Sequence, residues 1–319
     1  MRAVLYSLLR CSFCRSELTL SQDQEGDALV CRSCSRRAPV IDGIPRFVDV
    51  LHDPVARQTQ ESFGYEWTHF NDWRPSGEST FNDYFEGLAL DSLEGLTVLD
   101  AGCGMGRHAR QMAAHAEHVV AVDFSRAIDQ AARNMQDLSN VDCVQADLFA
   151  LPFADASFDY VYSMGVLHHV ADTEHALMGL VRKVRPGGRL RVYLYWKRHG
   201  WQGRLLSLVT LVRRATVMLS LPLLRVLCWF LSLGLYALIV LPYRALQAIG
   251  VRRHANWPLF VYTKYPFIVL YNDQFDRFSA PIEKRYDPDD VRRLLELAGL
   301  IDVTVQACFG WVAEGTKPA

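Results

Sequence analysis

The sequence lacks several features that would place it in common protein classes. It has no internal repeat and no low-complexity segment, and its formal net charge is only −1 over 319 residues. The first fourteen residues hold a short apolar stretch but no small-residue cleavage site, so a secretory signal is not predicted. We therefore expect a reducing, cytoplasmic setting, in which the eight cysteines do not form a disulfide framework.

Acidic residues are absent from one long segment. Between His175 and Asn272 there is no Asp or Glu, whereas fifteen Lys and Arg residues occur there. Such an asymmetry of charge indicates that the segment forms a surface that binds a partner. Within this segment, residues 226–243 form an uncharged, largely apolar run of eighteen residues between Arg225 and Arg244.

A glycine-rich turn follows a strongly apolar predicted strand. The strand ends near Asp100, and Gly102, Gly104 and Gly106 precede a predicted helix start at Arg107. Such a turn lets a ligand lie against bare backbone amides. The spacing is not that of the dinucleotide fingerprint, and an acid beside the loop repels a pyrophosphate but suits a cation. The turn therefore predicts a site for a positively charged nucleoside, of which S-adenosyl-L-methionine is the obvious example.

With this turn the sequence resembles the class I S-adenosylmethionine-dependent methyltransferases, in particular the small-molecule and lipid methylases. The resemblance covers residues 98–196 and 286–315 and implies an α/β fold with a Rossmann-like seven-stranded sheet. It implies that Asp123 binds the ribose hydroxyls, that Phe124 lies beside the adenine, and that Asp147 accepts a hydrogen bond from the adenine amino group. The full set of cofactor-binding residues expected from it is Asp100, Gly102, Gly104, Gly106, Asp123, Phe124, Asp147, Leu148 and Ser163.

Two histidines follow the predicted fourth strand. His168 and His169 should lie at the rim that faces the methyl group, because ligands bind at the carboxyl ends of parallel strands. A base is required only if the acceptor is a hydroxyl or an activated carbon acid. Either histidine is a candidate catalytic base, and the alternative is a histidine that only hydrogen-bonds the backbone or the cofactor.

Four cysteines near the start of the chain form two Cys-x-x-Cys pairs. Cys11 and Cys14 are separated from Cys31 and Cys34 by sixteen residues, a spacing typical of a zinc ribbon. Four thiolates leave no open position on the ion, so the predicted Zn²⁺ is structural; a redox pair is the alternative. The segment resembles the small zinc-ribbon proteins that partner tRNA and rRNA methyltransferases, here fused in cis.

That resemblance raises RNA as an alternative substrate, for which the ribbon would provide docking. Residues 1–50 are not notably basic and lack the interleaved aromatic residues that single-stranded RNA binding uses. The chain has Ser163-Met164-Gly165-Val166 where amino-group methylases of bases carry Asn/Asp-Pro-Pro-Tyr/Phe. We therefore do not expect a nucleic acid partner.

The acid-free segment allows three interpretations. A transmembrane helix needs ~20 apolar residues, and a single crossing would separate strands that must share one sheet. A hairpin of helices over about 204–221 and 223–246, broken at Pro222, would dip into one leaflet. The third interpretation is an apolar cap over the active site or a homodimer interface. We favour the hairpin, which would place a set of arginines at anionic headgroups, namely Arg204, Arg213, Arg214, Arg225, Arg244, Arg252 and Arg253.

These observations predict five segments. Residues 1–50 form the zinc ribbon, 51–95 an N-terminal lid with Tyr65, Trp67 and Trp73, 96–199 the cofactor-binding core, 200–270 the hydrophobic basic insertion, and 271–319 the C-terminal part of the core. Residues 271–278 are expected to be a substrate-facing loop in which Asp273, Asp276 and Arg277 contact a polar head; helix capping and surface ion pairs are the alternative roles for these three residues.

The predicted function is methyl transfer to a hydroxyl or carbon of a hydrophobic, lipid or lipid-linked substrate. The predicted location is the inner face of the cell membrane, with an anionic membrane surface as partner. The alternatives are an rRNA or tRNA methyltransferase and a cofactor-binding regulatory protein. The intact acidic and glycine positions argue against the regulatory protein.

Overall fold

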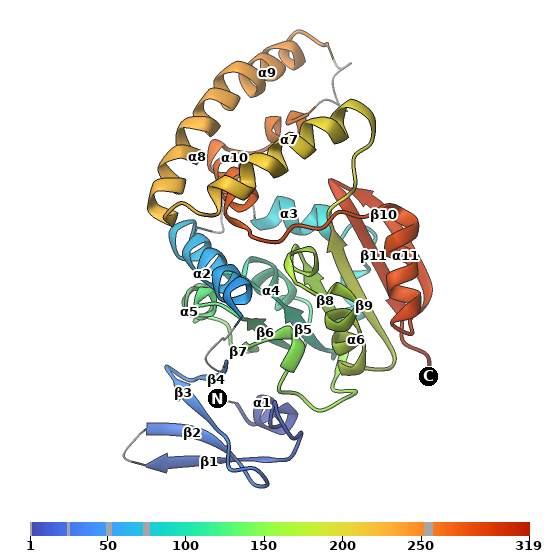
Figure 1. The fold of residues 1–319 in the computed structure, drawn as a ribbon. Coiled ribbons are helices and arrows are strands. Elements are labelled where there is room, and N and C mark those ends of the chain that lie inside the picture. The colour runs from blue at the N-terminus through green and yellow to red at the C-terminus, as the bar shows by residue number, and fades with distance from the viewer. Residues whose placement is uncertain (1, 24–25, 49–52, 73–76, 252–257) are drawn as a thin grey trace.

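The computed structural model describes residues 2–23, 26–48, 53–72, 77–251 and 258–319. Its centre is a sheet in which β7, β6, β5, β8 and β9 are parallel and β11 and β10 complete one edge in antiparallel fashion. This is the seven-stranded α/β sheet that the sequence predicts (Figure 1). The strands are β5 (Thr97–Ala101), β6 (His118–Asp123), β7 (Val141–Ala146), β8 (Phe158–Met164), β9 (Val184–Leu194), β10 (Ile301–Cys308) and β11 (Gly310–Thr316).

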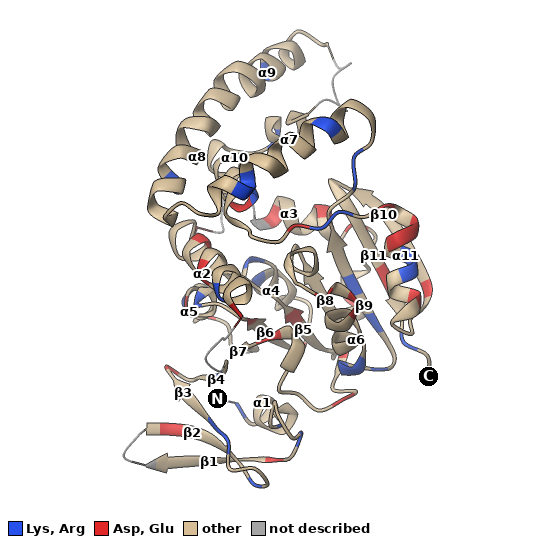
Figure 2. Cartoon of the chain, viewed as in Figure 1, with Lys and Arg blue, Asp and Glu red and all other residues tan. Residues whose placement is uncertain are grey.

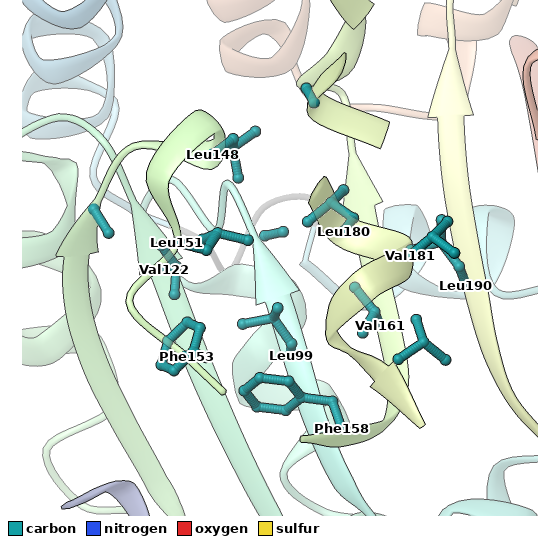
Figure 3. Packing of buried hydrophobic residues seen from close by; sticks show 14 of the residues in the cluster. Leu99, Val122, Leu148, Leu151, Phe153, Phe158, Val161, Leu180, Val181 and Leu190 are labelled. Carbon is teal, nitrogen blue, oxygen red and sulfur yellow. The ribbon is translucent and has the colours of Figure 1, made fainter. Parts of the chain in front are cut away.

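Both faces of this sheet are covered. In β5, Val98 packs into one hydrophobic cluster and the adjacent Leu99 into the other, and both side chains are fully buried. Continuous apolar strands are the sequence signature of a parallel sheet with helices on both faces. Figure 3 shows Leu99 and Val161 meeting Leu180 between the sheet and α6. The covering helices are α4 (Arg107–Met112), α5 (Ala127–Asn134), α6 (Thr173–Lys183) and α11 (Pro288–Leu297).

The cysteine-rich segment continues the same sheet. Its last strand, β4, pairs in parallel with β7, with Arg46 opposite Gln145. The Arg46 guanidinium also lies 2.5 Å from the Asp129 carboxylate of α5. The segment is therefore joined to the edge of the central sheet by backbone pairing and by an ion pair. Its elements are α1 (Ala3–Leu8), β1 (Leu18–Asp23), β2 (Gly26–Cys31), β3 (Arg37–Ile41) and β4 (Ile44–Phe47).

Two helices precede β5. Helix α2 (Pro54–His69) begins at Asp53, whose carboxylate accepts hydrogen bonds from the first-turn amides of Val55 and Ala56. Helix α3 (Gly77–Tyr84) and a short 3-10 turn (Leu90–Leu93) follow. These helices occupy the region predicted as a lid, and Trp73 lies outside the described residues.

The part of the acid-free segment that follows β9 forms a helical layer at the end of the molecule opposite the cysteines (Figure 1). Helix α7 (Gly200–Thr216) is followed by α8 (Leu221–Leu235), which has Pro222 in its first turn. Helix α8 runs through a π-helical turn, η4 (Tyr236–Val240), into α9 (Leu241–Ala248). The two expected helices are therefore present, but the break between them lies at 217–220 and not at Pro222. A 3-10 turn, η5 (Phe260–Thr263), leads to α10 (Phe267–Ser279).

One expectation for this region is wrong. Residues 271–278 were expected to be a loop, but they belong to α10. Leu270, Phe275 and Phe278 are buried and lie on one face of the helix at a spacing of three to five residues. The polar residues between them resemble a loop in composition, but they occupy the other face.

The helical layer is attached to the sheet at both ends. The chain leaves β9 after Leu194 and returns in β11, where Val312 pairs with Tyr193. Within the described parts of the chain, one helix, Leu221–Ala248, is long and apolar enough to cross a membrane by length and composition alone, and 22% of its most apolar window is buried.

Candidate functional site

The glycine turn after β5 is fixed by the neighbouring strand. The amides of Gly102 and Cys103 both donate to the Val122 carbonyl at 2.8 Å, and the Gly104 amide donates to Asp123 Oδ2 at 2.8 Å. Gly102 has a φ of +91°, and a Cβ there would lie 2.4 Å from a methyl group of Val166. The turn therefore requires glycine at this position.

Asp123 ends β6 beside this turn. Its carboxylate accepts hydrogen bonds from the Gly104 amide and from the amide and hydroxyl of Ser125. A carboxylate offers about four acceptor positions, so Asp123 can accept one more hydrogen bond, as from a ribose hydroxyl. Asp147 similarly caps the short turn η2 (Leu148–Ala150) by accepting from the Phe149 amide at 3.0 Å.

A cavity of about 1610 Å³ opens above the carboxyl ends of the parallel strands. Only part of the predicted cofactor set lies in its wall. The predicted cofactor residues that line the cavity are Gly102, Gly104, Asp123, Phe124, Asp147 and Leu148.

The other three predicted cofactor residues are buried behind this wall. Ser163 is fully buried and donates to the Ala101 carbonyl at 2.7 Å. Gly106 packs against Met135 and Ala131. Asp100 is buried with Oδ2 lacking a hydrogen-bond partner among the described residues. These positions support the turn from below.

The environment of the turn favours a cation. Burial raises the pKa of Asp100 to about 7 and raises the pKa of Asp123. Burial also raises the pKa of Glu66 on α2, whose Oε2 is buried and has no hydrogen-bond partner among the described residues. A nearby positive charge stabilises ionised carboxylates, so the residues present fit the sulfonium and ammonium groups of S-adenosylmethionine.

Sequence reasoning missed Glu66. Glu66 lies within the aromatic segment 63–67, for which the sequence predicts only a lid. Its place among these aromatic residues is the signal that could have identified it. Its neighbour Trp67 lines the cavity and lies close over Gly104, with the Arg107 guanidinium 5.3 Å from its ring centroid. Tyr65 stacks on His69 at 3.8 Å and is not part of the cavity wall.

The two histidines after β8 differ in position. His169 lines the cavity, and its Nδ1 lies 2.7 Å from the Ile282 carbonyl. Because a carbonyl only accepts, Nδ1 carries the proton and Nε2 is free to accept one. His168 is fully buried, stacks on Tyr195 at 3.8 Å and is not part of the wall. Burial lowers the pKa of His168 well below its usual value.

Helix α10 brings a second group of acids to the cavity. The Tyr195 hydroxyl donates to Asp276 Oδ2 at 2.9 Å, and Asp276 Oδ1 lies 3.8 Å from His169 Nε2. The Tyr262 hydroxyl donates to Asp273 at 2.7 Å. Asp273, Asp276 and Arg277, which were expected to contact a polar head, all line the cavity.

Two arginines expected at lipid headgroups point inward instead. Arg213 is buried in an ion pair with Glu283 at 2.7 Å, because it lies on the inner face of α7. Arg244 donates to the carbonyl groups of Thr263 and Tyr265. Arg204 and Arg214 are exposed and Arg225 is half-buried, whereas Arg252 and Arg253 lie outside the described residues.

The four N-terminal cysteines converge at the other end of the chain. Their ligand atoms all lie within 4.8 Å of one another, with Cys14 and Cys31 Sγ 3.3 Å apart and Cys11 and Cys34 Sγ 3.6 Å apart. A tetrahedral zinc with bonds of about 2.3 Å places its sulfurs about 3.8 Å apart. The donor set therefore fits a closed structural Zn²⁺ site.

The two cysteine pairs have the same local geometry. The Arg15 amide donates to the Cys11 carbonyl, and the Ser35 amide donates to the Cys31 carbonyl. Arg15 and Ser35 both have a positive φ, of 65° and 56°. Each pair is thus a tight knuckle that turns its two thiols to the same side.

Two family models match these two regions. Residues 99–192 match the model described as a methyltransferase domain, and residues 4–43 match the model described as Trm112p-like protein. The first match begins just before the glycine turn, and the second includes all four cysteines.

Individual relatives match part of the chain. The O-methyltransferase rstn1 of Aspergillus nomiae is 40% identical over 112 residues, which are 33% of this chain and 49% of that protein. Phosphoethanolamine N-methyltransferase 2 of Caenorhabditis elegans is 32% identical over 175 residues, covering 52% of this chain and 38% of that protein. The chain thus spans about half the length of these curated relatives, or less.

Among solved structures, Haemonchus contortus phosphoethanolamine N-methyltransferase 2 is similar with a TM-score of 0.49 and 16% identity. That similarity covers 86% of this chain and 62% of the other.

The zinc site is tested by removing one ligand. Replacing Cys34→Ser leaves three thiolates, so native mass spectrometry should find about one zinc per wild-type chain and none in the variant. Because a structural zinc stabilises its fold, limited proteolysis should cleave residues 1–48 faster in the variant. Cys308→Ser, far from the knuckles, should keep its zinc. Zinc retained by Cys34→Ser would contradict the assignment.

The acid on α10 predicts a pH dependence. Burial raises the pKa of Asp273 from 3.8 to about 6. The folded protein thus binds this proton more tightly than the unfolded chain, and ionisation costs stability as pH rises towards 6. Asp273→Asn keeps an acceptor for Tyr262 and should raise the melting temperature at pH 8, but less at pH 5. The control is the same change at the exposed Asp302, Asp302→Asn. An equal rise in the melting temperature of Asp273→Asn at both pH values would contradict the raised pKa of Asp273.

The family matches, the glycine turn with its flanking acids and the four converging thiols all agree. The chain contains a class I S-adenosylmethionine-dependent methyltransferase domain preceded by a Trm112p-like four-cysteine zinc module.

Proposed function

We propose that this protein transfers a methyl group from S-adenosylmethionine to a hydroxyl or activated carbon of a hydrophobic acceptor, a lipid or lipid-linked molecule, at a membrane surface. The observation that carries the proposal is one continuous cavity that joins the glycine turn to the apolar inner faces of α7 and α8. At about 1610 Å³ it exceeds the ~300–1,000 Å³ of ordinary ligand pockets. It has room for the methyl donor and a second large molecule.

The strand order separates the two ligands. The turns after β5, β6 and β7 carry the glycines and acids suited to the donor. Beyond β5 on the other side, β8 and β9 lead into His169 and Tyr195, which line the cavity. The acceptor atom therefore belongs on the side of β8 and β9.

The acceptor side continues into an apolar arm. Gln202, Leu205, Leu206 and Val209 line the cavity at the spacing of one helical face of α7. Leu231, Leu235 and Ile239 of α8 and η4 also line it. These side chains suit a hydrocarbon chain.

When bound, S-adenosylmethionine supplies a methyl group whose bond to sulfur breaks as the bond to the acceptor forms. The protein's task is to align the acceptor and to exclude water. On a hydroxyl acceptor, His169 takes the proton at Nε2, the nitrogen that the Ile282 contact leaves free. Asp276, 3.8 Å from that nitrogen, stabilises the protonated ring.

The outer faces of the same helices support a membrane location. Leu208 and Leu211 of α7 are 57% and 60% exposed, and Phe230 of α8 and Leu238 of η4 are 62% and 79% exposed. Monomeric soluble proteins rarely expose contiguous apolar patches of large area, and such patches mark interaction sites. A cap that served only to enclose the cavity would be apolar on its inner face alone.

The charge of this layer suits anionic lipid. No acidic residue occurs on α7, α8 or α9, which carry scattered basic residues (Figure 2). Exposed Arg204 and Arg214 each add about 1 kcal/mol of attraction near an anionic surface. Because both ends of the layer join one sheet, we place α7–α9 along the surface and not across the bilayer.

RNA methylation remains the alternative function. The four-cysteine module lies at the opposite end of the molecule from the helical layer (Figure 1), and its described residues do not line the cavity. The arginines of α7 and α8 stand among Leu, Val and Ala in the sequence, whereas nucleic-acid backbone binding uses basic residues among polar ones.

The reaction is tested with labelled methyl donor and a total lipid extract. We expect the label in the organic phase. His169→Asn keeps a donor for the Ile282 carbonyl but cannot act as a base, so kcat should fall by about 10²-fold or more while calorimetry finds unchanged binding of S-adenosylmethionine. His175→Ala, on the exposed side of α6, is the control. Label recovered in RNA would favour RNA methylation instead. An unchanged kcat in His169→Asn would contradict the assignment of His169 as the catalytic base.

The membrane location is tested by flotation with vesicles that contain phosphatidylglycerol. Wild-type protein should float with them, and the double variant Leu211→Asp/Phe230→Asp should not, since it buries two charges at the lipid boundary. Leu297→Asp alters an equally exposed leucine on α11 and should float. Wild-type protein that ignores vesicles would contradict the membrane proposal while leaving the methyl-transfer assay to be judged separately.

A further inference from the structure

The short extended segment between β9 and α7 directs its charges to two sides. Lys197 Nζ and His199 Nε2 both approach the same carboxylate, Asp287, at 3.5 and 2.7 Å. Arg198, between them, lines the cavity instead. Successive side chains of an extended chain point in opposite directions, so Asp287 neutralises the neighbours of Arg198 and leaves Arg198 itself to the cavity.

Arg198 is held in place by an aromatic ring. Its guanidinium carbon lies 3.6 Å from the centroid of the Trp196 ring. Among the described residues it has no hydrogen bond and no ion pair. Its planar fork of five donors therefore remains available, already positioned and partly removed from water.

A second guanidinium lies beside it. Arg285 lines the same cavity, donates to the Trp196 carbonyl at 3.3 Å and lies 5.2 Å from the Tyr195 ring centroid. Burial, and after it the positive charge of Arg285, lowers the pKa of Arg198. Arg198 thus packs on the ring of Trp196 and Arg285 on the ring of the adjacent Tyr195, and their positive charges repel each other.

The nearest carboxylate on this side of the cavity is already used by other arginines. Glu283 binds Arg285 at 2.8 Å and the buried Arg213 at 2.7 Å, so one carboxylate serves two guanidinium groups. Arg198 is the third and has no carboxylate partner among the described residues. A negatively charged ligand would supply the missing charge.

The location of this pair divides the cavity. On one side lie His169 and Tyr195, at the proposed reacting centre. On the other side, α7 begins at Gly200 without a side-chain cap, and its inner face turns apolar within two turns, at Leu205. The positive end of a helix also favours an anion. An acceptor that spans the cavity therefore meets a polar centre, then two arginines, then hydrocarbon.

We propose that Arg198, together with Arg285, binds the phosphate group of the acceptor, which is a long-chain lipid phosphate whose chain follows α7 and α8. Two guanidinium groups can share the oxygens of a phosphate, whereas a carboxylate is matched by one. This proposal rests on the proposed function, since it assigns the class of the same acceptor.

Three probes separate the sources of binding energy. Decyl phosphate, inorganic phosphate and decanol are titrated by calorimetry into the full chain with S-adenosylhomocysteine present, below the micelle concentration. Decyl phosphate should bind at least about ten-fold more tightly than either of the others, because charge-assisted hydrogen bonds each contribute about that factor. Equal binding of decyl phosphate and decanol would overturn the anion site.

Variants locate the effect. Arg198→Gln should weaken decyl phosphate about ten-fold or more and leave decanol unchanged, and Arg198→Lys should recover part of the loss. Arg293→Gln removes an exposed arginine from α11 and should change neither. Unchanged affinity for S-adenosylhomocysteine establishes that each variant is folded.

The two proposals fail in different ways. If Arg198→Gln weakens decyl phosphate and decanol equally, the arginine only shapes the cavity and the phosphate assignment is wrong, while methyl transfer to neutral lipids would still support the proposed function. If inorganic phosphate alone competes as well as decyl phosphate, the ligand is free phosphate and not a lipid.

Discussion

The antiparallel pairing of β9 with β11 is the constraint on which the rest of the structure depends. It fixes both ends of the helical layer to one sheet, so α7–α10 cannot leave the methyltransferase domain as a separate unit. The layer must therefore close over the carboxyl ends of β8 and β9, where His169 and Tyr195 lie. One cavity with an acidic end and an apolar arm results from this attachment.

Much of the fold could be predicted because its signals are local. The turn at Gly102 needs glycine for its own backbone angle, and Cys11-x-x-Cys14 needs only four residues to form a knuckle. β6 is buried along its whole length and apolar from Val119 to Val122, and this apolar run is visible in the sequence alone. Each of these features can be recognised from residues that are close together in the sequence.

The interior of the cavity could not be predicted because it depends on distant contacts. Helix α10 looked like a loop, since its polar residues face the cavity and not water. The sequence alone predicts Arg213 at a lipid headgroup, but Arg213 lies on the inner face of α7, where it pairs with Glu283. Glu66 and Arg198 line the cavity only because α2 and the segment after β9 meet other segments there. Composition cannot distinguish a polar residue facing solvent from one facing an internal cavity.

The separation of β9 and β11 along the chain also sets an order of folding. More than a hundred residues lie between Leu194 and Gly310. During synthesis, β9 therefore cannot pair with β11 until the whole helical layer has been made. Pairing over such a distance is slow, and the apolar helices leave the ribosome before the strands that retain them. During that interval the apolar side chains of the layer lack the sheet that later holds it, and exposed apolar surface of this kind makes a partly folded chain prone to aggregation.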